Sequence, residues 1–283
     1  MTALHSQSTA NSASNATTNA SAAAGKTALV TGASGGIGQS LAEQFARDGI
    51  NLVIVARSTA QLEAHAAQWR KQYGVQVTVM SSDLAQVGAA QALYERISAQ
   101  GIAIDYLVNN AGSGSFGVCA ESDLDYEVAT MRLNMETLTI LTKRFLPGII
   151  ARRGKVLNVA STASFQPGPY MAVYCATKAY VLSFTEALAV ELAGTGVSVT
   201  ALCPGPTVSG FQDKAAMNDS ALIKGKLFPM QTSDQVGLAG YRAMQRGERV
   251  YIPGVMNWLM AQSVRFTPRR VVTMMVKQAM KPV

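Results

Sequence analysis

Short apolar runs alternate with longer segments of helical pattern along most of the chain. The apolar runs are TALVT (27–31), NLVIVA (51–56), VQVTVM (75–80), IDYLVNN (104–110), KVLNVAS (155–161) and VSVTALCP (197–204). The main helical segments are 37–47, a stretch ending near Tyr73, 122 to the Pro147-Gly148 pair, and 173–192. Nearly continuous apolar runs are typical of parallel strands buried on both faces. The alternation predicts an α/β fold, a single doubly wound Rossmann-type domain in which helices cover both faces of a parallel sheet.

The two ends of the chain depart from this pattern. Residues 1–24 consist mainly of Ala, Ser, Thr and Asn and contain no Asp, Glu, Lys or Arg, so we expect a disordered, low-complexity extension. This stretch lacks both the apolar core of a signal peptide and the arginines of a mitochondrial presequence. Residues 256–283 are predicted to form a basic amphipathic helical extension. The Rossmann-type domain then covers residues 25–255.

In the C-terminal extension, Thr267 is the expected cap of a helix, and Pro268 is expected in its first turn. An apolar stripe runs along this helix between basic side chains, and it consists of Val271, Val272, Met275, Val276 and Ala279. Such a helix suits peripheral contact with an anionic membrane surface. Packing against the domain or against a second subunit is favoured over membrane contact. The sequence leaves both alternatives open.

Charge and rare residues exclude several classes of function. The net charge is +7, but eight basic residues against Glu248 alone lie from Arg242 onward, and the preceding part carries 16 basic and 16 acidic residues. The main domain has no basic stripe, so no nucleic-acid partner is expected. With two histidines, three scattered cysteines and no HExxH or CxxC motif, neither a metal site nor a Ser-His-Asp hydrolase is expected. The odd number of cysteines favours reduced thiols in a cytoplasmic protein.

A glycine-rich segment, TGASGGIG (31–38), follows the first apolar run and precedes the first helix. Gly32 permits a tight turn there, while Gly36 and Gly38 allow the backbone and the helix to approach a pyrophosphate. The free amides at a helix N-terminus attract such an anion. The GxxxGxG spacing differs from the usual GxGxxG fingerprint, and a purely structural turn is the alternative.

Arg57 stands at the end of the second apolar run and is followed by Ser58. Sites for NAD usually carry an acidic residue here, which hydrogen-bonds the ribose 2′-hydroxyl. A guanidinium instead suits the 2′-phosphate of NADP. The alternative is an ordinary solvated residue at a strand end. The sequence therefore predicts NADP(H) as the cofactor.

Four features in order carry a family resemblance. They are TGASGGIG, NNAG (109–112), Ser161, and YCATK (174–178), which begins thirteen residues beyond that serine. Together they resemble the short-chain dehydrogenase/reductase family, in its compact, NADP-linked type, over roughly residues 26–255. The resemblance also implies a homodimer or homotetramer, and a substrate lid at about residues 208–232.

The resemblance implies a catalytic group of four residues. Tyr174 would be the general acid in carbonyl reduction and the base in alcohol oxidation. Lys178, one helical turn later, would lower the pKa of the phenol and bind the nicotinamide ribose. Ser161 would hydrogen-bond the substrate oxygen, and Asn134 would hold a water that links the lysine to solvent. Cys175, next to the tyrosine, is expected to make the site sensitive to thiol reagents.

By the same resemblance, the cofactor contacts extend along the chain. Asp83 in SSDL would contact the adenine, and CPGPT (203–207) would hold the nicotinamide end. The full predicted set is Gly32, Ser34, Gly36, Ile37, Gly38, Arg57, Asp83, Asn110, Ala111, Gly112, Tyr174, Lys178, Pro204, Gly205 and Thr207. No metal ligand is predicted.

The predicted substrate is a small-molecule ketone or secondary alcohol of apolar character. Apolar side chains gather in the lid and near the catalytic tyrosine, namely Phe116, Phe165, Tyr170, Phe211, Met217, Leu222, Leu227, Phe228 and Met230. Such residues are also ordinary core residues. If they line the cleft, an apolar ketone or a long-chain alcohol is favoured over a sugar.

Two other functions compete with an NADP(H)-dependent oxidoreductase. A cofactor sensor or scaffold would keep the fold without the chemistry, but such a protein is expected to lose the tyrosine or the lysine. An epimerase or dehydratase of the extended relatives would need a longer substrate domain and a different glycine spacing. Hydride transfer, in contrast, needs the protein only to orient a carbonyl and deliver one proton. We therefore predict the oxidoreductase.

Overall fold

Seven strands form one parallel sheet in the computed structural model, which describes residues 25–211, 215 and 230–281. They are β1 (Thr27–Thr31), β2 (Asn51–Ala56), β3 (Val77–Ser81), β4 (Tyr106–Asn109), β5 (Lys155–Val159), β6 (Ser198–Leu202) and β9 (Val250–Tyr251). Their spatial order is β3-β2-β1-β4-β5-β6-β9. The winding reverses between β1 and β4, the switch point at which doubly wound sheets bind ligands. The predicted fold class is confirmed.

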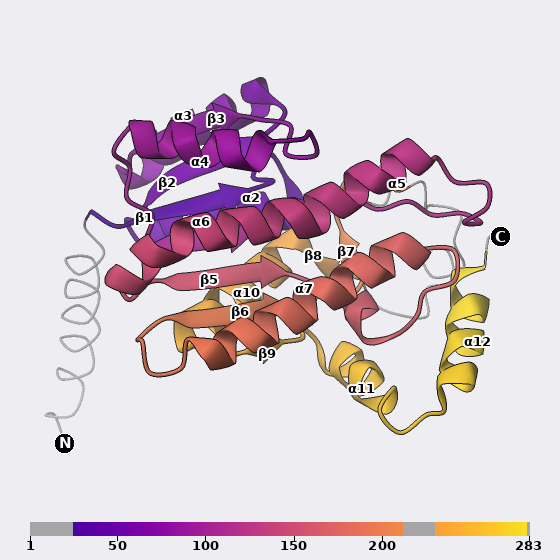
Figure 1. Ribbon diagram of the computed structural model, residues 1–283. Helices are drawn as coiled ribbons and strands as arrows, with labels where there is room; N and C mark the ends of the chain where they lie inside the picture. Colours follow the sequence, from indigo (N-terminus) through magenta and orange to yellow (C-terminus); the bar gives the residue numbers. More distant parts are fainter. Residues whose placement is uncertain (1–24, 212–214, 216–229, 282–283) are drawn as a thin grey trace, which may run out of the picture.

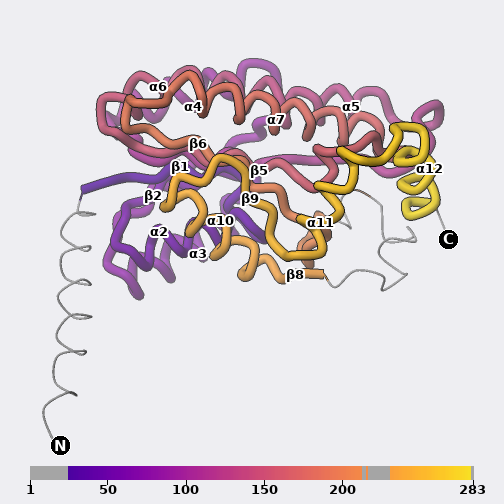
Figure 2. Tube along the Cα trace, turned by 90° about the horizontal axis from the view of Figure 1, so that it is seen from below, coloured from indigo at the N-terminus to yellow at the C-terminus, as the bar shows by residue number. Residues whose placement is uncertain are grey.

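Helices cover both faces of this sheet, as Figure 1 and Figure 2 show. One face carries α2 (Gly36–Arg47), α3 (Thr59–Tyr73) and α10 (Ser233–Arg246). The other carries α4 (Ala89–Ala99), α5 (Leu124–Met131), α6 (Leu138–Ala151) and α7 (Ala172–Glu191). Each face has its own apolar core, with Phe45 and Trp69 buried in the first and Leu141 and Ile149 in the second. The strands between them are buried on both sides, which explains their continuous apolar runs.

Smaller elements gather beyond the carboxyl ends of the strands (Figure 1). They are η2 (Thr162–Phe165), the two-stranded parallel sheet of β7 (Thr207–Val208) and β8 (Gln231–Thr232), and the helices α11 (Val255–Ser263) and α12 (Arg269–Met280). This edge of the molecule therefore receives the segments that follow most of the long strands.

The long helical segment that begins near residue 122 continues beyond its predicted end. It runs through α5, the π-helical η1 (Arg132–Thr137) and α6, which reaches Ala151 with Pro147 inside it. A proline within a helix removes the hydrogen bond to the carbonyl four residues earlier. That carbonyl belongs to Lys143, and both Pro147 and Lys143 are exposed. Water can satisfy the carbonyl, so the helix tolerates the proline.

Two C-terminal helices differ from the sequence predictions. Helix α10 was not predicted, although Thr232 and Gln235 form a capping box at its start, a signal that the sequence does contain. Helix α12 has Pro268 at its N-cap position, and the Thr267 hydroxyl donates a hydrogen bond to the carbonyl of Ser263, 2.9 Å away. The prediction that Thr267 caps this helix was therefore wrong, because its hydroxyl closes the preceding turn instead.

Two predicted segments lie largely outside the described residues. The N-terminal extension, 1–24, is one of them. Of the proposed lid at 208–232, residues 212–214 and 216–229 are likewise not described, and these include Met217, Leu222, Leu227 and Phe228. Both predictions stay untested.

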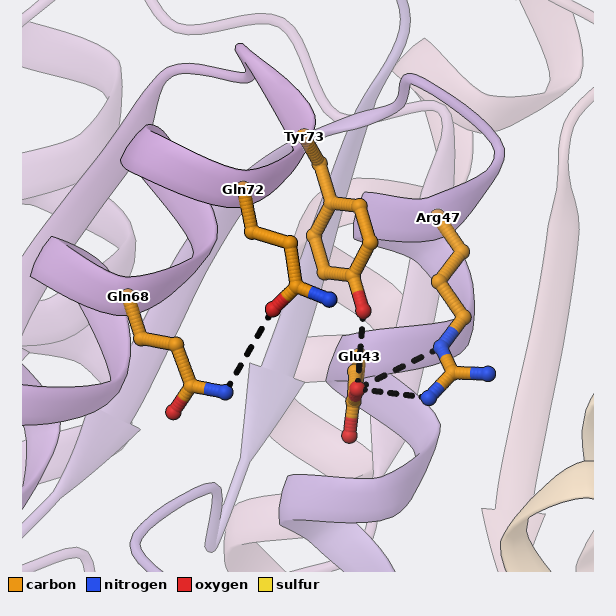
Figure 3. A network of polar contacts seen from close by, with 5 residues as sticks. All are labelled: Glu43, Arg47, Gln68, Gln72 and Tyr73. Atoms are coloured by element: carbon orange, nitrogen blue, oxygen red, sulfur yellow. Dashed lines mark hydrogen bonds and ion pairs between the residues drawn. The ribbon is translucent and has the colours of Figure 1, made fainter.

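A polar network joins α2 to α3 on the first face of the sheet (Figure 3). The Glu43 carboxylate accepts hydrogen bonds from the Tyr73 hydroxyl at 2.9 Å and from Nη2 of Arg47 at 2.8 Å. Burial alone would raise the pKa of Glu43, but the hydrogen bonds from Arg47 and Tyr73 outweigh it and lower that pKa. The network thus joins the helices of two successive βαβ units, β1-α2-β2 and β2-α3-β3.

Candidate active site

A cavity of about 1740 Å³ lies at the carboxyl edge of the sheet. Its walls come from the segments that follow β1, β2, β3, β4, β5 and β6, and from α7, α11 and α12. Of the seventeen predicted site residues, all line this cavity except Gly38 and Asn134. The fold thus brings together residues that are scattered over most of the sequence.

The glycine-rich turn between β1 and α2 forms one end of the cavity. Gly32 has φ +68°, and a Cβ there would lie 2.7 Å from Nδ2 of Asn110, so this position requires glycine. Gly38 is buried behind the turn and packs against Gly32 and Asn110. In the described residues no side chain caps α2, and its first turn contains no acidic residue. The amides at this N-terminus can therefore bind an anionic group.

Arg57 and Asp83 lie at the same end of the cavity, after β2 and β3. Arg57 is exposed at the edge. Hydrogen bonds from Gln86 and from the Ala85 amide, together with the charge of Arg57, lower the pKa of Asp83 against the opposing effect of burial. A cation and an ionised carboxylate thus follow the two strands on one side of β1, whose carboxyl end leads into the glycine-rich turn.

Ser161, Tyr174 and Lys178 meet at the other end of the cavity. Tyr174 and Lys178 lie one turn apart on α7, and the Lys178 ammonium is 5.8 Å from the centre of the Tyr174 ring. Lys178 Nζ donates a hydrogen bond to the carbonyl of Val159 at the end of β5, 2.8 Å away. Ser161 caps η2, where its hydroxyl accepts from the amide of Ala163 at 3.1 Å. These contacts hold Lys178 and Ser161 near the end of β5, and Tyr174 lies one helical turn before the lysine.

Asn134 stands behind the cavity wall, within the π-helical η1. It is 1% exposed. Its Nδ2 donates to the carbonyl of Ser113 at 2.9 Å and to the Thr177 hydroxyl at 2.9 Å, and its Oδ1 accepts from the amide of Ser113 at 3.0 Å. A Cβ on Gly112 would lie 3.2 Å from Asn134 Oδ1 and 3.4 Å from Lys178 Nζ. Asn134 therefore joins α7 to the segment after β4 close to the lysine, from a π-helical turn of the kind often found at functional sites.

Burial dominates the ionisation of the two α7 residues. It raises the pKa of Tyr174 to about 12, although a hydrogen bond from Ser161 acts in the opposite direction. It lowers the pKa of Lys178 to about 8, with a smaller opposing effect from Cys203. A phenol that stays protonated beside an amine with a pKa near neutrality is suited to proton delivery.

One wall of the cavity was not predicted from the sequence motifs. It comes from α11, α12 and the loop between them, through Met260, Val264, Val272, Val276 and Met280 among others. Val276 and Met280 pack in the same apolar cluster as Met171, Tyr174 and Phe211. The apolar stripe of the C-terminal helix was the available signal, but a stripe does not reveal which surface covers it.

The aromatic residues expected in the cleft divide between two places. Phe211 packs on the Tyr174 ring, with ring centres 5.3 Å apart, and lines the cavity. Phe116 and Tyr170 join the same apolar cluster but do not line the cavity. Phe165 instead packs against the cluster around Leu138 and Val181, so its predicted place in the cleft was wrong.

All three cysteines lie in the described part of the chain and are free. Cys175 is 6% exposed, and burial raises the pKa of its thiol to about 11. Cys203 is fully buried, whereas Cys119 is exposed. A buried, protonated thiol reacts slowly, yet Cys175 lines the cavity, so its sensitivity to thiol reagents stays a prediction.

The sheet order and the glycine-rich turn place the chain in the class of doubly wound, Rossmann-type α/β proteins. The family model described as short chain dehydrogenase matches residues 26–219. The chain belongs to this family of oxidoreductases.

Individual relatives agree with the family assignment. A very-long-chain 3-oxoacyl-CoA reductase from Anas platyrhynchos is 34% identical over 187 residues, which cover 64% of this chain and 59% of that protein. The match thus spans less than two thirds of that relative. A solved short-chain dehydrogenase from Sphingobium yanoikuyae in complex with NADPH has a TM-score of 0.75 at 31% identity, covering 85% of this chain and 94% of that one. A bulky-bulky ketone specific alcohol dehydrogenase from Comamonas testosteroni has a TM-score of 0.72 at 29% identity, covering 85% and 92%.

Proposed function

We propose that the chain is an NADP(H)-dependent oxidoreductase that interconverts a ketone and a secondary alcohol. The observation that carries this proposal is the meeting of the glycine-rich turn, Arg57 and the Ser161–Tyr174–Lys178 group in one cavity. The NADPH bound to the related chain from Sphingobium yanoikuyae supports the same cofactor here.

The residues present fit this dinucleotide. The Gly32 turn and the uncapped N-terminus of α2 would hold the pyrophosphate. Arg57 would bind the 2′-phosphate, and Asp83 would contact the adenine. Asn110 to Gly112, with Pro204, Gly205 and Thr207, would hold the nicotinamide end. When bound, the cofactor supplies or accepts the hydride.

The protein itself would move one proton. In ketone reduction, the Tyr174 hydroxyl gives its proton to the carbonyl oxygen as hydride reaches the carbonyl carbon. In alcohol oxidation, the phenolate takes that proton back. Ser161, which acts to lower the pKa of the phenol, would orient the same substrate oxygen. Lys178 would bind the cofactor ribose and stabilise the phenolate, because a nearby cation favours the charged form.

An apolar substrate is favoured by the wall that α12 supplies. Val272, Val276 and Met280 line the cavity, and Phe211 packs on the catalytic tyrosine. The apolar surface they offer cannot satisfy the hydroxyl groups of a sugar. The related enzyme from Comamonas testosteroni, which acts on bulky ketones, is consistent with this substrate class.

The rival function is a catalytically silent NADP-binding sensor or scaffold. It would need the cofactor end of the cavity but no proton donor. The chain keeps the tyrosine, the lysine and the serine in one place, which favours the enzyme. Expected assembly as a homodimer or homotetramer, and a place in the cytoplasm, remain predictions.

Fluorescence titration with NADPH and NADH tests the proposal, with the unmodified chain compared with Arg57→Ala. We expect a clear preference for NADPH that falls about tenfold or more in the variant, because the 2′-phosphate loses a charged hydrogen-bond donor. Arg242→Ala is the matched control, since Arg242 is exposed on α10 and does not line the cavity. If the unmodified chain binds both cofactors equally well, Arg57 does not bind the 2′-phosphate. If it binds neither cofactor, the proposed function is contradicted.

A further inference from the structure

Exposed apolar side chains concentrate on the last two helices. The described residues include fifteen large apolar side chains that are exposed, and eight of them lie between positions 255 and 275. These eight form what is called here the α11–α12 surface: Val255, Met256, Trp258, Leu259, Phe266, Val271, Met274 and Met275. Phe266 is 87% exposed and Met274 71%. A concentration of this kind marks an interaction site.

The opposite faces of the same helices are packed against the domain. Ala261 on α11 is 2% exposed, and Val272 and Met280 on α12 are 6% and 8% exposed. Asn257 is buried and donates to the carbonyl of Pro253 at 2.7 Å. Both helices are thus docked through one side, and they lie at one end of the molecule (Figure 1, Figure 2). The side chains of the α11–α12 surface are exposed, and of these Met275 also lines the cavity.

The charged residues within this C-terminal segment are of one sign. Residues 255–283 contain five basic side chains and no acidic one, the basic residues being Arg265, Arg269, Arg270, Lys277 and Lys281. An anionic partner complements them. A second copy of the chain does not, because a two-fold interface brings the same patch of each copy together and would oppose like charges.

The dimensions restrict the kind of contact. Helices α11 and α12 have 9 and 12 residues, which is too short to cross a bilayer. Within 25–211, 215 and 230–281, no helix is long and apolar enough to span a membrane. Short helices with one apolar and one basic aspect lie in the plane of the lipid headgroups.

We propose that the α11–α12 surface docks onto an anionic lipid bilayer. Trp258 and Phe266 enter the boundary between headgroups and acyl chains, while Arg265, Arg269 and Arg270 contact lipid phosphates and carboxylates. Docking would bring the cavity wall on the reverse side of α12 close to the bilayer. This binding does not depend on the reaction that the cavity performs.

The two tryptophans provide a direct assay. Trp69 is 1% exposed and stacks on His65, whereas Trp258 is 50% exposed. A change of tryptophan emission on adding vesicles therefore reports Trp258. We expect a shift to shorter wavelength, and sedimentation of the full chain, with vesicles of phosphatidylcholine and phosphatidylserine but not with phosphatidylcholine alone. Both signals should weaken as salt is raised.

Substitutions separate charge from apolar contact. The triple variant R265Q/R269Q/R270Q should bind anionic vesicles about a hundredfold more weakly. Phe266→Ser and Met274→Ser should each weaken binding about tenfold, because each removes buried apolar area at the bilayer. Val87→Ser and Val190→Ser are matched controls on exposed valines elsewhere, at 78% and 57% exposure, and should bind as the unmodified chain does. All variants should retain NADPH binding, which shows that they are folded.

Three results would overturn the proposal. The first is no sedimentation with anionic vesicles. The second is equal sedimentation with neutral and anionic vesicles. The third is a Trp258 shift that follows protein concentration without lipid, which would assign the surface to contact between copies of the chain.

Discussion

At the scale of single residues, burial sets the chemistry of the proposed acid and base. The pKa of Tyr174 is raised to about 12 and that of Lys178 is lowered to about 8 by the same loss of solvent. Against this effect of burial, Ser161 acts to lower the pKa of the phenol. The lowering of the phenol pKa by Lys178, which the family resemblance implies, stays a prediction.

The raised pKa of Tyr174 gives the two reaction directions different pH profiles. Oxidation needs the phenolate, whose fraction rises about tenfold per pH unit below the pKa. We expect kcat/KM for alcohol oxidation to rise with pH between roughly 6 and 8, where Lys178 is still mainly charged. Reduction needs the neutral phenol and should change little over the same range. Initial rates in both directions check this, and an oxidation rate that is independent of pH would contradict the assignment.

Removing the phenolic hydroxyl of Tyr174 should greatly slow the reaction without weakening cofactor binding. Tyr174→Phe is expected to lower kcat about 10²- to 10⁴-fold, because one general acid–base group is lost, with little change in NADPH affinity. Tyr126→Phe is the matched control: Tyr126 also lines the cavity, but its hydroxyl donates to the carbonyl of Gly114 at 3.2 Å. Steady-state kinetics and NADPH titration of both variants provide the comparison.

At the scale of elements, the sequence predicts the strands and helices that have a local hydrophobic pattern. It does not predict how segments far apart in the sequence pack together. The strands and the helices around β1 to β6 follow from apolar runs and glycine punctuation. The cavity was predictable because parallel strands end at one edge. The packing of α12 over Met171 and Cys175 joins segments about a hundred residues apart, and no local signal encodes such a contact. The same holds for Phe165, because the direction of its side chain, and so the cluster it packs against, depends on the conformation of η2.

The network between α2 and α3 predicts a pH-dependent stability. Glu43→Gln should lower the free energy of unfolding by about 1–2 kcal/mol at pH 7, because the hydrogen bonds to the carboxylate are weakened. The pKa of Glu43 is lowered in the folded chain, so this contribution is present above the unfolded pKa and is lost as pH falls below about 4. Glu63→Gln is the control, since Glu63 is half-exposed and 3.5 Å from Arg70, and it should cost little. Urea denaturation at pH 7 and pH 4 measures both.

Helix α12 offers a matched pair of substitutions for the substrate hypothesis. Val276→Asp places a charge in the apolar cavity wall, and Met274→Asp places one on the outward side of the same helix. We expect the first to lower kcat/KM for apolar ketones about tenfold or more, because a buried carboxylate is costly, and the second to leave it unchanged. NADPH affinity should be the same in both. Equal effects of the two substitutions on kcat/KM would contradict the hypothesis that α12 selects the substrate.

At the scale of the whole molecule, function is concentrated at one edge. The glycine-rich turn, the proposed catalytic group and the α12 wall all line the cavity beyond the carboxyl ends of the strands, and Arg265, Arg269 and Arg270 lie on or next to the adjoining helices α11 and α12. In the described part of the chain, the opposite edge, where the strands begin, contributes no residue to this cavity. Docking of the α11–α12 surface onto a bilayer, as proposed, would therefore leave the packing of the two apolar cores unchanged.

Assembly is the least constrained property at this scale. The family resemblance predicts a homodimer or homotetramer. An apolar groove formed by Met131, Met135, Ile140 and Tyr180 on the outer side of α5, α6 and α7 is a surface that a second copy can cover. Light scattering coupled to gel filtration should give two or four times the chain mass of 29.8 kDa. A mass of one chain at all concentrations would contradict the prediction.

The distribution of the three cysteines has a practical consequence. Cys175 and Cys203 are buried and protonated, while Cys119 is exposed in the segment that follows Phe116. A maleimide dye added to the native enzyme should therefore attach at one known position, without any engineered thiol. Because Phe116, three residues earlier, packs in the apolar cluster around Tyr174, a dye at Cys119 should report changes of environment in the segment next to that cluster.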